Sequence, residues 1–204
     1  MLPTAIWRIE QIWKGETVFL FGGGPSLKAV DLERLRDRKT LALNSTAKLA
    51  LWASALFFTD HPWLEKNHAL VTNWSGYAFT LSYPQVRNLP TNVKSVCALV
   101  QDELFTGGAI KRGRTTGHTA ISLAAILGAK RIVLLGYDMR FVGGRSHCHD
   151  DYASPNEKIY SDDFIPYFKG WNEAARKAGV EVLNATPGSA LEEFPMVDLA
   201  AVID

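Results

Sequence analysis

Short apolar runs alternate along the chain with polar or glycine-rich turns. Such runs occupy residues 17–21, 40–43, 55–58, 131–135 and 180–183, and each stops at a glycine or a polar residue. Apolar runs of four or five residues bounded in this way are typical of strands that are buried on both faces. We therefore expect a strand in each of these runs.

Segments with helical spacing separate the runs. We expect helices at residues 27–36, 47–52, 117–128 and 164–177. Ser26 is a suitable N-cap for the first helix, and a glycine ends the third. Alternating strands and helices indicate parallel strands joined by right-handed crossovers. The expected fold class is therefore α/β: a single domain over residues 1–204 with a Rossmann-like, doubly wound, mostly parallel sheet.

Two segments interrupt this pattern. Residues 61–111 mix aromatic residues, prolines and polar residues, so we expect a variable insertion there, with short strands at 69–72, 77–80 and 93–98. Residues 140–160 are rich in glycine, histidine and aspartate. Because functional side chains are often carried on loops, we expect this segment to be a polar active-site loop.

The composition argues against several classes of protein. The 204 residues are 47% hydrophobic, which is enough for one core, and the net charge is only +1, with 22 basic and 21 acidic residues interleaved. We expect neither nonspecific nucleic-acid binding nor attachment to an anionic membrane. The two cysteines, Cys97 and Cys148, are too far apart to suggest a disulfide framework or a cysteine zinc site. Charged residues near the N-terminus and the lack of a long apolar run predict a soluble, cytoplasmic protein.

Polar or small residues follow the predicted strands directly or within a few residues. They are Gly22, Asn44, Asp60, Asp138 and Asn184. In an open parallel sheet, ligands bind outside the carboxyl ends of the strands. We therefore expect the functional site at this edge of the sheet.

The glycine turn, Gly22, Gly23, Gly24, Pro25 and Ser26, connects the first strand to the first helix. Without Cβ atoms, its backbone N–H groups can approach a phosphate, with the positive end of a helix behind them. The turn matches neither the P-loop nor the common dinucleotide-binding spacing. The alternative is a tight turn that binds no ligand.

Four further residues at the strand ends have both a functional and a structural interpretation. Asn44 and Ser45 can hydrogen-bond a ribose, a base or a phosphate, or they can cap a helix. Asp60 and Asp138 can bind a metal, hydrogen-bond a sugar hydroxyl or act as a base, or they can be ordinary turn residues.

The polar loop contains His147 and His149 together with Asp150 and Asp151. Such a cluster can supply a general base or bind a divalent metal, and it can also be a solvated loop. Upstream of the predicted helix at 117–128, Arg112 or Arg114 can clamp a phosphate or carboxylate, with Thr116 at the helix start. The alternative is surface charges and an N-cap.

These motifs, taken in order, resemble a known group of proteins. The segments are 18–27, 43–45, 116–117, 127–138 and 184–191. The chain resembles the bacterial sialyltransferases of glycosyltransferase family 42. It also resembles the domain family of motility accessory factors and archaeal 6-hydroxymethylpterin diphosphokinases, and in size it is similar to small phage and prophage proteins.

In the sialyltransferases, the matching residues hold a cytidine monophosphate sugar donor, and a histidine acts as the base. The resemblance assigns the donor to Gly22, Gly24, Pro25, Ser26, Asn44, Thr116 and Gly117, and the base to His147 or His149. At the position of a family asparagine this chain has Gly23. Either Arg112 or Arg114 can correspond to the family's arginine before the Thr-Gly pair. Tyr152 and Tyr160 are candidates for the tyrosines that neutralise the leaving phosphate.

The expected activity is metal-independent transfer from a nucleotide sugar, with a loop histidine as general base. The first alternative is a diphosphokinase acting on a small alcohol such as a pterin, in which Asp60, Asp138 and Asp150 position magnesium. The second is a noncatalytic nucleotide-binding phage accessory protein. No tightly bound cofactor is expected, and the expected partners are a nucleotide or nucleotide sugar and an acceptor of unknown identity. The sequence is compatible with an oligomer.

Overall fold

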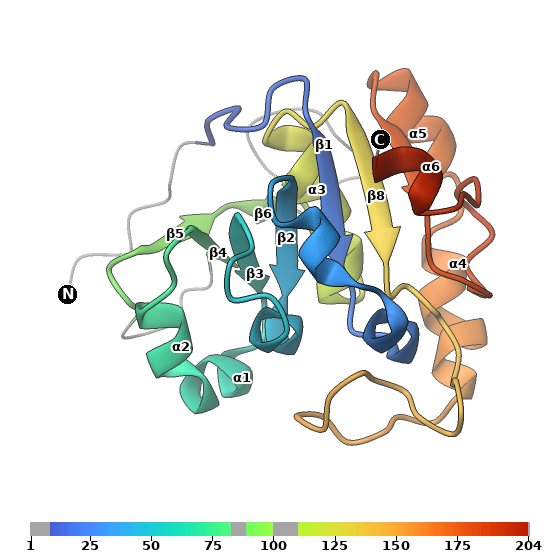
Figure 1. The fold of residues 1–204 in the computed structure, drawn as a ribbon, viewed down its shortest axis with the longest axis horizontal. Helices are drawn as coiled ribbons and strands as arrows, with labels where there is room; N and C mark the ends of the chain where they lie inside the picture. The colour runs from blue at the N-terminus through green and yellow to red at the C-terminus, as the bar shows by residue number, and fades with distance from the viewer. Residues whose placement is uncertain (1–8, 83–88, 100–109, 204) are drawn as a thin grey trace.

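The computed structural model describes residues 9–82, 89–99 and 110–203. Within these ranges the chain is built around a seven-stranded sheet with the order β5-β4-β3-β2-β1-β8-β9, in which every strand pair is parallel (Figure 1). The strands are β1 (Thr17–Phe21), β2 (Lys39–Leu43), β3 (Ala55–Phe58), β4 (Tyr77–Leu81), β5 (Val93–Val96), β8 (Arg131–Leu135) and β9 (Glu181–Asn184). A second, two-stranded sheet joins β6 (Ala98–Leu99) to β7 (Ile110–Lys111). The expected α/β fold with a parallel sheet is confirmed.

The direction in which the sheet grows reverses at β1. Strands β2 to β5 are added on one side of β1, whereas β8 and β9 are added on the other. The register pairs Phe21 with Leu135, so the turns that follow β1 and β8 lie next to each other. In doubly wound sheets a ligand crevice forms at such a switch point.

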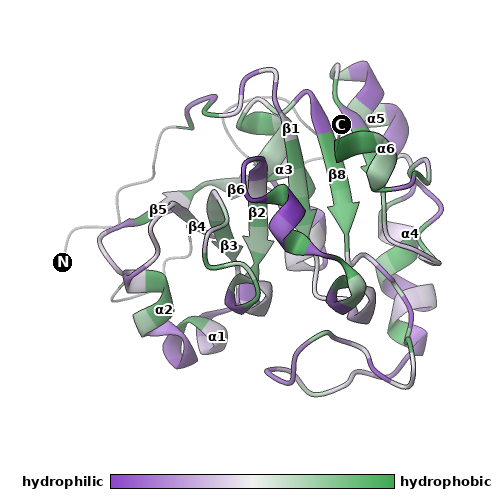
Figure 2. Cartoon of the chain, in the orientation of Figure 1, coloured by the Kyte–Doolittle hydropathy of each residue, from purple (hydrophilic) through white to green (hydrophobic). Residues whose placement is uncertain are grey.

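Helices cover both faces of the sheet because side chains in each strand alternate between them. Val18 and Leu20 belong to a core shared with α3 (Thr116–Ile126) and α5 (Trp171–Lys177). Phe19 and Phe21 belong to the opposite core. This second core also contains residues of α1 (His61–Lys66), α2 (His68–Thr72) and α6 (Ala200–Ile203). Figure 2 shows the apolar strands between the two layers.

The helices expected at 27–36 and 47–52 differ from the structure. The first segment forms two 3-10 helices, η1 (Pro25–Ala29) and η2 (Leu32–Leu35). In the second segment, only residues 47–48 are helical, as the end of the 3-10 helix η3 (Asn44–Lys48). The backbone is extended at Val30, and Asp31 caps η2 by accepting a hydrogen bond from the N–H of Glu33. These local bonds compete with a continuous α-helix.

Residues 61–111 are more closely integrated into the fold than the expected insertion. The strand expected at 77–80 is β4, whereas the one at 93–98 divides into β5 and β6, and both β4 and β5 extend the main sheet. The strand expected at 69–72 is wrong, because these residues lie in α2. Packing explains the difference, since Val71 and the following Trp74 are buried against the second core. Residues 83–88 and 100–109 of the expected insertion lie outside the described residues.

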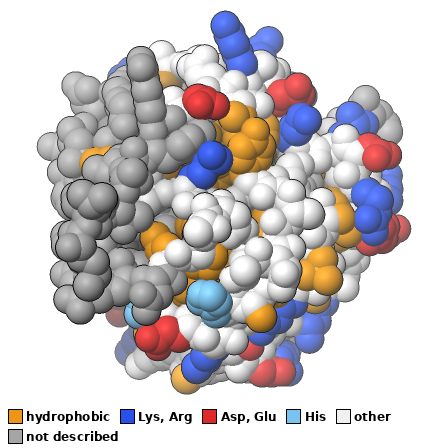
Figure 3. Space-filling view, turned by 90° about the vertical axis from the view of Figure 1, so that its left-hand side faces the viewer, with side chains coloured by type: hydrophobic (Ala, Val, Ile, Leu, Met, Phe, Trp, Pro, Cys, Tyr) orange, Lys and Arg blue, Asp and Glu red, His pale blue; other side chains and the backbone are white. Residues whose placement is uncertain are grey.

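The last predicted helix, at 164–177, is divided in the structure. A π-helical turn, η4 (Tyr160–Phe164), continues into α4 (Ile165–Tyr167), and α5 starts after Gly170. Gly170, the residue before α5, has a φ of 82°, a left-handed conformation that reorients the chain between α4 and α5. None of the helices in the described residues is long and apolar enough to cross a bilayer. On the face drawn in Figure 3, basic and acidic side chains are interspersed among apolar ones.

Candidate functional site

A cavity of about 590 Å³ opens at the carboxyl edge of the sheet, beside the junction of β1 and β8. The polar loop at 140–155 passes beneath these strand ends (Figure 1). Fourteen predicted site residues line the cavity: Gly22, Gly23, Gly24, Asn44, Asp60, Arg112, Arg114, Thr116, Gly117 and Asp138, and from the predicted loop at 140–160 also His147, His149, Tyr152 and Tyr160. Pro25, Ser26 and Ser45 are not among its lining residues. The fold therefore gathers residues from six separate segments at one site.

Several lining residues were not singled out from the sequence. They include Thr59, Tyr137, Met139 and Ser146. The hydroxyl of Thr59 lies 2.6 Å from that of Thr116, so the end of β3 contacts the start of α3. The position of Thr59 directly after an apolar run was a signal that could have identified it.

Close packing with the neighbouring turn requires glycine at two positions of the glycine turn. A Cβ at Gly22 would lie 2.7 Å from the carbonyl oxygen of Gly136, and one at Gly24 would overlap the carboxylate of Asp138. The N–H of Gly22 donates to Leu135 O at 2.7 Å, and that of Gly24 donates to Gly136 O at 2.8 Å. These two amide groups therefore bind the protein itself.

Asp138 holds the other end of the same turn. Its Oδ2 accepts a hydrogen bond from the Ser26 hydroxyl at 2.8 Å, and its Oδ1 accepts one from the Ser26 N–H at 3.3 Å. Asp138 is 2% exposed, and this burial raises the pKa of its carboxyl group although the bonds from Ser26 lower it. In the part of the chain that the structure describes, Gly23 is the one residue of the turn whose N–H has no protein acceptor.

The start of α3 differs from the glycine turn in this respect. Thr115 is the N-cap, and its hydroxyl accepts a hydrogen bond from the N–H of His118 at 3.3 Å. The amides of Thr116 and Gly117 precede the first intrahelical bond. No described residue accepts a hydrogen bond from either of them. Both residues line the cavity, so the positive end of an eleven-residue helix faces it.

His118 fixes this helix start within the core. Its ring stacks on Phe168 at 3.8 Å, its Nδ1 lies 2.8 Å from the Thr115 hydroxyl, and its Nε2 lies 3.1 Å from the Phe164 carbonyl oxygen. Since a carbonyl only accepts, Nε2 carries the proton and Nδ1 accepts from Thr115. Burial lowers the pKa of His118 to about 3. The histidine is therefore neutral and structural at ordinary pH.

Two buried polar atoms at the cavity have no hydrogen-bond partner among the residues that the structure describes. Asn44 has a left-handed backbone with a φ of 48°, and its Nδ2 donates to the Thr116 hydroxyl at 3.3 Å, but its Oδ1 has no partner. The hydroxyl of Tyr152 is buried as well; it lies close to the Asp60 carboxylate, but no described residue is at hydrogen-bonding geometry to it. Burial, and then the carboxylate of Asp60, raise the pKa of Tyr152 above its usual range, so the phenol keeps its proton. Unpaired buried polar groups cost about 1–3 kcal/mol each, and a ligand can satisfy them.

The two loop histidines face the glycine turn. Their rings are stacked with centroids 5.2 Å apart, and a Cβ at Gly23 would lie 3.4 Å from His149 Nε2 and 3.5 Å from His147 Cδ2. The N–H of Cys148, between them, donates to Gly23 O at 2.8 Å. Burial lowers the pKa of His147, and burial followed by the proximity of His147 lowers that of His149 to about 4. Both imidazoles are therefore neutral near pH 7.

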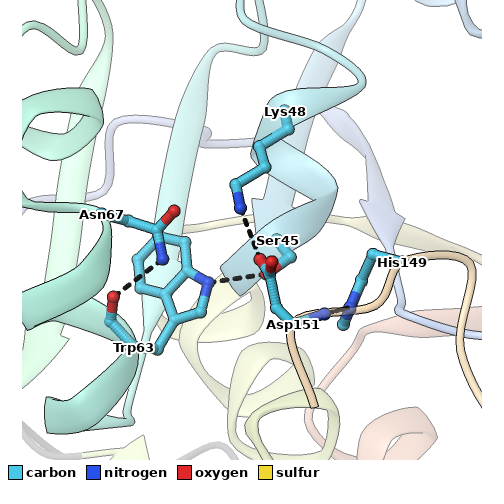
Figure 4. A network of polar contacts seen from close by, with 6 residues as sticks. All are labelled: Ser45, Lys48, Trp63, Asn67, His149 and Asp151. Atoms are coloured by element: carbon cyan, nitrogen blue, oxygen red, sulfur yellow. Dashed lines mark hydrogen bonds and ion pairs between the residues drawn. The ribbon is translucent and has the colours of Figure 1, made fainter.

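A network of polar contacts, which we name the Asp151 latch, holds the loop against η3 (Figure 4). Asp151 accepts hydrogen bonds from Lys48 Nζ at 2.6 Å and from the Ser45 hydroxyl. Trp63 Nε1 donates to the Ser45 oxygen at 2.7 Å. The bonds from Lys48 and then Ser45 hold the pKa of Asp151 below its usual value. In this structure Ser45 thus contacts the loop, whereas the sequence suggested that it contacts a ligand.

The remaining acidic candidates are separated from one another. Asp60 lines the cavity, whereas Asp150 is exposed and pairs with Arg145. Arg114 is exposed and forms an ion pair with Asp163 at 3.1 Å. Among the residues that the structure describes, no three His, Cys, Asp or Glu side chains are grouped as ligands for one metal ion.

Comparison with known proteins supports the fold. No protein-family model matches the sequence, and neither does any curated protein. Among solved structures, the chain is similar to the sialyltransferase CST-II, crystallised in complex with a trisaccharide acceptor and CMP. The match has a TM-score of 0.53 and 18% sequence identity, and it covers 89% of this chain and 86% of the other. The chain therefore has a glycosyltransferase-like α/β fold.

Proposed function

We propose that this protein is a metal-independent glycosyltransferase that uses a nucleotide sugar as donor. The observation that carries the proposal is the pair of unpartnered buried atoms, Asn44 Oδ1 and the Tyr152 hydroxyl, on the wall of a cavity at the switch point of the sheet. One atom can only accept and the other can donate, so together they fit a ligand that carries both hydroxyl or amino groups and anionic oxygens. A nucleotide sugar has both. The complex of the similar fold with CMP and a trisaccharide supports the same class.

The start of α3 is the best position for the donor phosphate. Free amides at Thr116 and Gly117 and the positive end of the helix stabilise an anion. Arg112 and Arg114 lie at the same rim and add positive charge. Asn44 Oδ1, which is next to Thr116, then accepts a hydrogen bond from a hydroxyl or amino group of the nucleoside.

The histidine loop supplies the proton acceptor for the chemical step. A bond forms between the acceptor oxygen and the anomeric carbon of the sugar, while the bond from that carbon to the phosphate oxygen breaks. The proton of the acceptor hydroxyl passes to a neutral loop imidazole, and the nucleotide leaves with the electron pair of the broken bond. Tyr152 donates a hydrogen bond to the departing phosphate. A positioned base contributes about 10²- to 10⁴-fold to such a step.

The diphosphokinase alternative has less support from the geometry. It requires several carboxylates around magnesium. The two oxygens of Asp138 accept hydrogen bonds from Ser26, and Asp150 pairs with Arg145 outside the cavity lining. Asp60 and Asp138 both line the cavity, but since Asp138 binds Ser26, Asp60 is the one remaining candidate magnesium ligand of the three.

Thermal unfolding in the presence of nucleotides tests the proposal. The protein is heated with CMP, CDP, UDP, GDP, ADP or ATP, each with and without magnesium. A nucleotide at about 100 times its Kd should add roughly 2.7 kcal/mol to stability. We expect stabilisation by a nucleoside mono- or diphosphate without magnesium. Stabilisation only by ATP with magnesium would support the diphosphokinase instead, and no stabilisation by any nucleotide would reject both.

Turnover of the corresponding nucleotide sugar is then measured in histidine variants. His147→Ala and His149→Ala change the loop, and His68→Ala is the matched control because His68 is exposed on α2 away from the cavity. The control should keep wild-type turnover. Full turnover in both loop variants would show that no loop histidine is the base, and binding without any turnover in the wild type would favour the noncatalytic alternative.

A further inference from the structure

We propose that the two loop histidines have opposite proton roles: His147 is the base through an unprotonated Nε2, and His149 is a donor whose Nε2–H binds an anionic oxygen of the ligand beside Gly23. The assignment rests on the proposed function for the identity of the ligand. The proton positions themselves follow from hydrogen bonds within the protein.

The proton of His147 is positioned by Ser146. The Ser146 hydroxyl donates to Ser154 Oγ at 3.1 Å, and it lies 2.9 Å from His147 Nδ1. A hydroxyl has one hydrogen. Because that hydrogen is directed to Ser154, the Ser146 oxygen accepts a hydrogen bond from Nδ1–H. The lone pair of the neutral His147 ring is therefore on Nε2, which is the atom that can remove a proton.

The proton of His149 is positioned on the opposite nitrogen. The backbone N–H of Asp151 donates to His149 Nδ1 at 3.4 Å, so Nδ1 carries the lone pair and Nε2 carries the hydrogen. Nε2 is also the nitrogen nearest Gly23, since a Cβ there would lie 3.4 Å from it. The N–H of Gly23 has no acceptor among the described residues. Two donors, the Gly23 amide and His149 Nε2–H, therefore remain for an anion at the centre of the turn.

The Asp151 latch keeps the donor amide in place. Lys48 and Ser45 hold the Asp151 side chain, and Trp63 holds Ser45 (Figure 4). Because Ser45 and Trp63 are buried, the latch joins the loop to the core. Asp151 is thus a positioning residue, which fixes the tautomer of His149 through its own backbone.

The surroundings of His149 keep the ring neutral, so that its tautomer matters. Burial is the main cause of the lowered pKa of His149, and His147 and Lys48 lower it further, whereas Asp151 and Asp150 raise it. The pKa of His147 is lowered by burial as well. Near pH 7 each ring has one proton, and the hydrogen bonds decide which nitrogen carries it.

Nitrogen-15 NMR of the two rings at pH 7 tests the proton positions without any ligand. We expect the Nδ1–H form for His147 and the Nε2–H form for His149. Equal tautomers in the two rings, or the reverse assignment, would overturn the proposal. In Asp151→Ala we expect the His149 signal to shift toward a mixture of both forms. An unchanged signal would overturn the positioning role of Asp151.

Binding of CMP to glutamine variants tests the donor role. Glutamine places an amide N–H near the position of Nε2 but is no base at neutral pH. We expect His149→Gln to bind CMP within about threefold of the wild type and His149→Ala to bind about tenfold more weakly, as loss of one hydrogen bond to an anion implies. Equal weakening in both variants would reject the donor role. His147→Gln should bind CMP normally but lose at least about 10²-fold in turnover.

Failure of CMP to bind and failure of sugar transfer would have different consequences for the two proposals. If CMP does not bind the wild type at millimolar concentration, the donor role toward this nucleotide is rejected together with its place in the proposed function. The tautomers, measured without nucleotide, still decide the proton positions. If CMP binds but no sugar is transferred, the proposed reaction fails while the binding comparison of Gln and Ala at position 149 stands. Thermal unfolding of each variant confirms that it is folded.

Discussion

The glycine turn after β1 and the first turn of α3 line the same cavity, but they use their backbone amides differently. In the glycine turn, the N–H group of Gly22 donates to the end of β8, and those of Gly24 and Ser26 donate to the segment after β8. At the start of α3, the amides of Thr116 and Gly117 have no acceptor among the described residues. The glycines at this strand end therefore serve close packing.

The helices behind the two turns differ as well. The glycine turn leads into η1, a 3-10 helix of five residues without a side-chain cap. The turn at Thr115 leads into an α-helix of eleven residues with a threonine cap. Since aligned peptide dipoles add along a helix, the field on an anion is stronger at α3. We therefore expect the glycine turn to affect mainly stability and α3 to affect mainly binding.

The largest expected effect is that of Gly24→Ala. The new Cβ would overlap the Asp138 carboxylate and lie 2.6 Å from Gly136 O, and both neighbours are held by hydrogen bonds from the glycine turn. We expect a loss of about 3 kcal/mol or more in the free energy of unfolding, measured by urea denaturation. Gly23→Ala is the matched control, because its Cβ would meet only the histidine rings at 3.4 Å and beyond. Equal losses at both positions would contradict the packing role of Gly24.

The next prediction is that stability falls at low pH because of His118, which is buried beside the start of α3. The folded-state pKa of His118 is about 3, below the ordinary value of 6.5. Between these values the unfolded chain binds more protons, so stability is fully present above about pH 6.5 and falls as the pH is lowered toward 3. Between pH 7 and pH 4 the expected loss is on the order of 3 kcal/mol, no larger than that of Gly24→Ala.

The variant His118→Phe should remove part of the dependence of stability on pH. Phenylalanine can keep the stack on Phe168, but it leaves the Phe164 carbonyl without its donor, so we expect a loss of about 1–3 kcal/mol at pH 7. Urea denaturation from pH 4 to 7 should give a flatter stability profile than in the wild type. His149, whose pKa is about 4, keeps part of the slope. An unchanged slope would show that His118 does not titrate in this way.

A smaller effect is expected from Ser26→Ala. The variant loses the 2.8 Å hydrogen bond from the Ser26 hydroxyl to Asp138, but it keeps the backbone bond to the same carboxylate. We expect a loss of about 1 kcal/mol in stability and CMP affinity within about threefold of the wild type. Calorimetric titration measures the affinity. A tenfold loss of affinity with unchanged stability would mean that Ser26 contacts the ligand.

The smallest change in stability is expected from Thr116→Val, which alters the start of α3 and leaves the glycine turn unchanged. Valine keeps the shape of threonine but removes the hydroxyl that contacts Asn44 and Thr59. We expect stability to change by less than about 1 kcal/mol. CMP should bind several-fold more weakly, because Asn44 loses the group that orients its amide. Unchanged affinity would show that the Asn44 amide, which the Thr116 hydroxyl orients, does not contact the nucleotide.

Local sequence features predicted much of this protein. The apolar runs at 17–21 and 131–135 form strands because their side chains are buried on both faces, and the helix expected at 117–128 corresponds to α3. Most candidate site residues meet at one cavity because parallel strands bring their carboxyl ends to the same edge. The segment 61–111 was harder to predict, since membership of β4 and β5 in the sheet depends on their neighbours.

The strand ends and the polar residues that follow them could be predicted from the sequence, because these features depend on side chains a few positions apart. The contacts of those residues could not be predicted in this way, because they depend on how the chain packs in three dimensions. Ser26 binds Asp138 across 112 positions of sequence, and Ser45 binds Asp151 across 106. Whether an amide or a hydroxyl is free for a ligand depends on an acceptor that folding brings from elsewhere in the chain. Hydrogen bonds act over about 3 Å in space, whatever the separation of their partners in sequence.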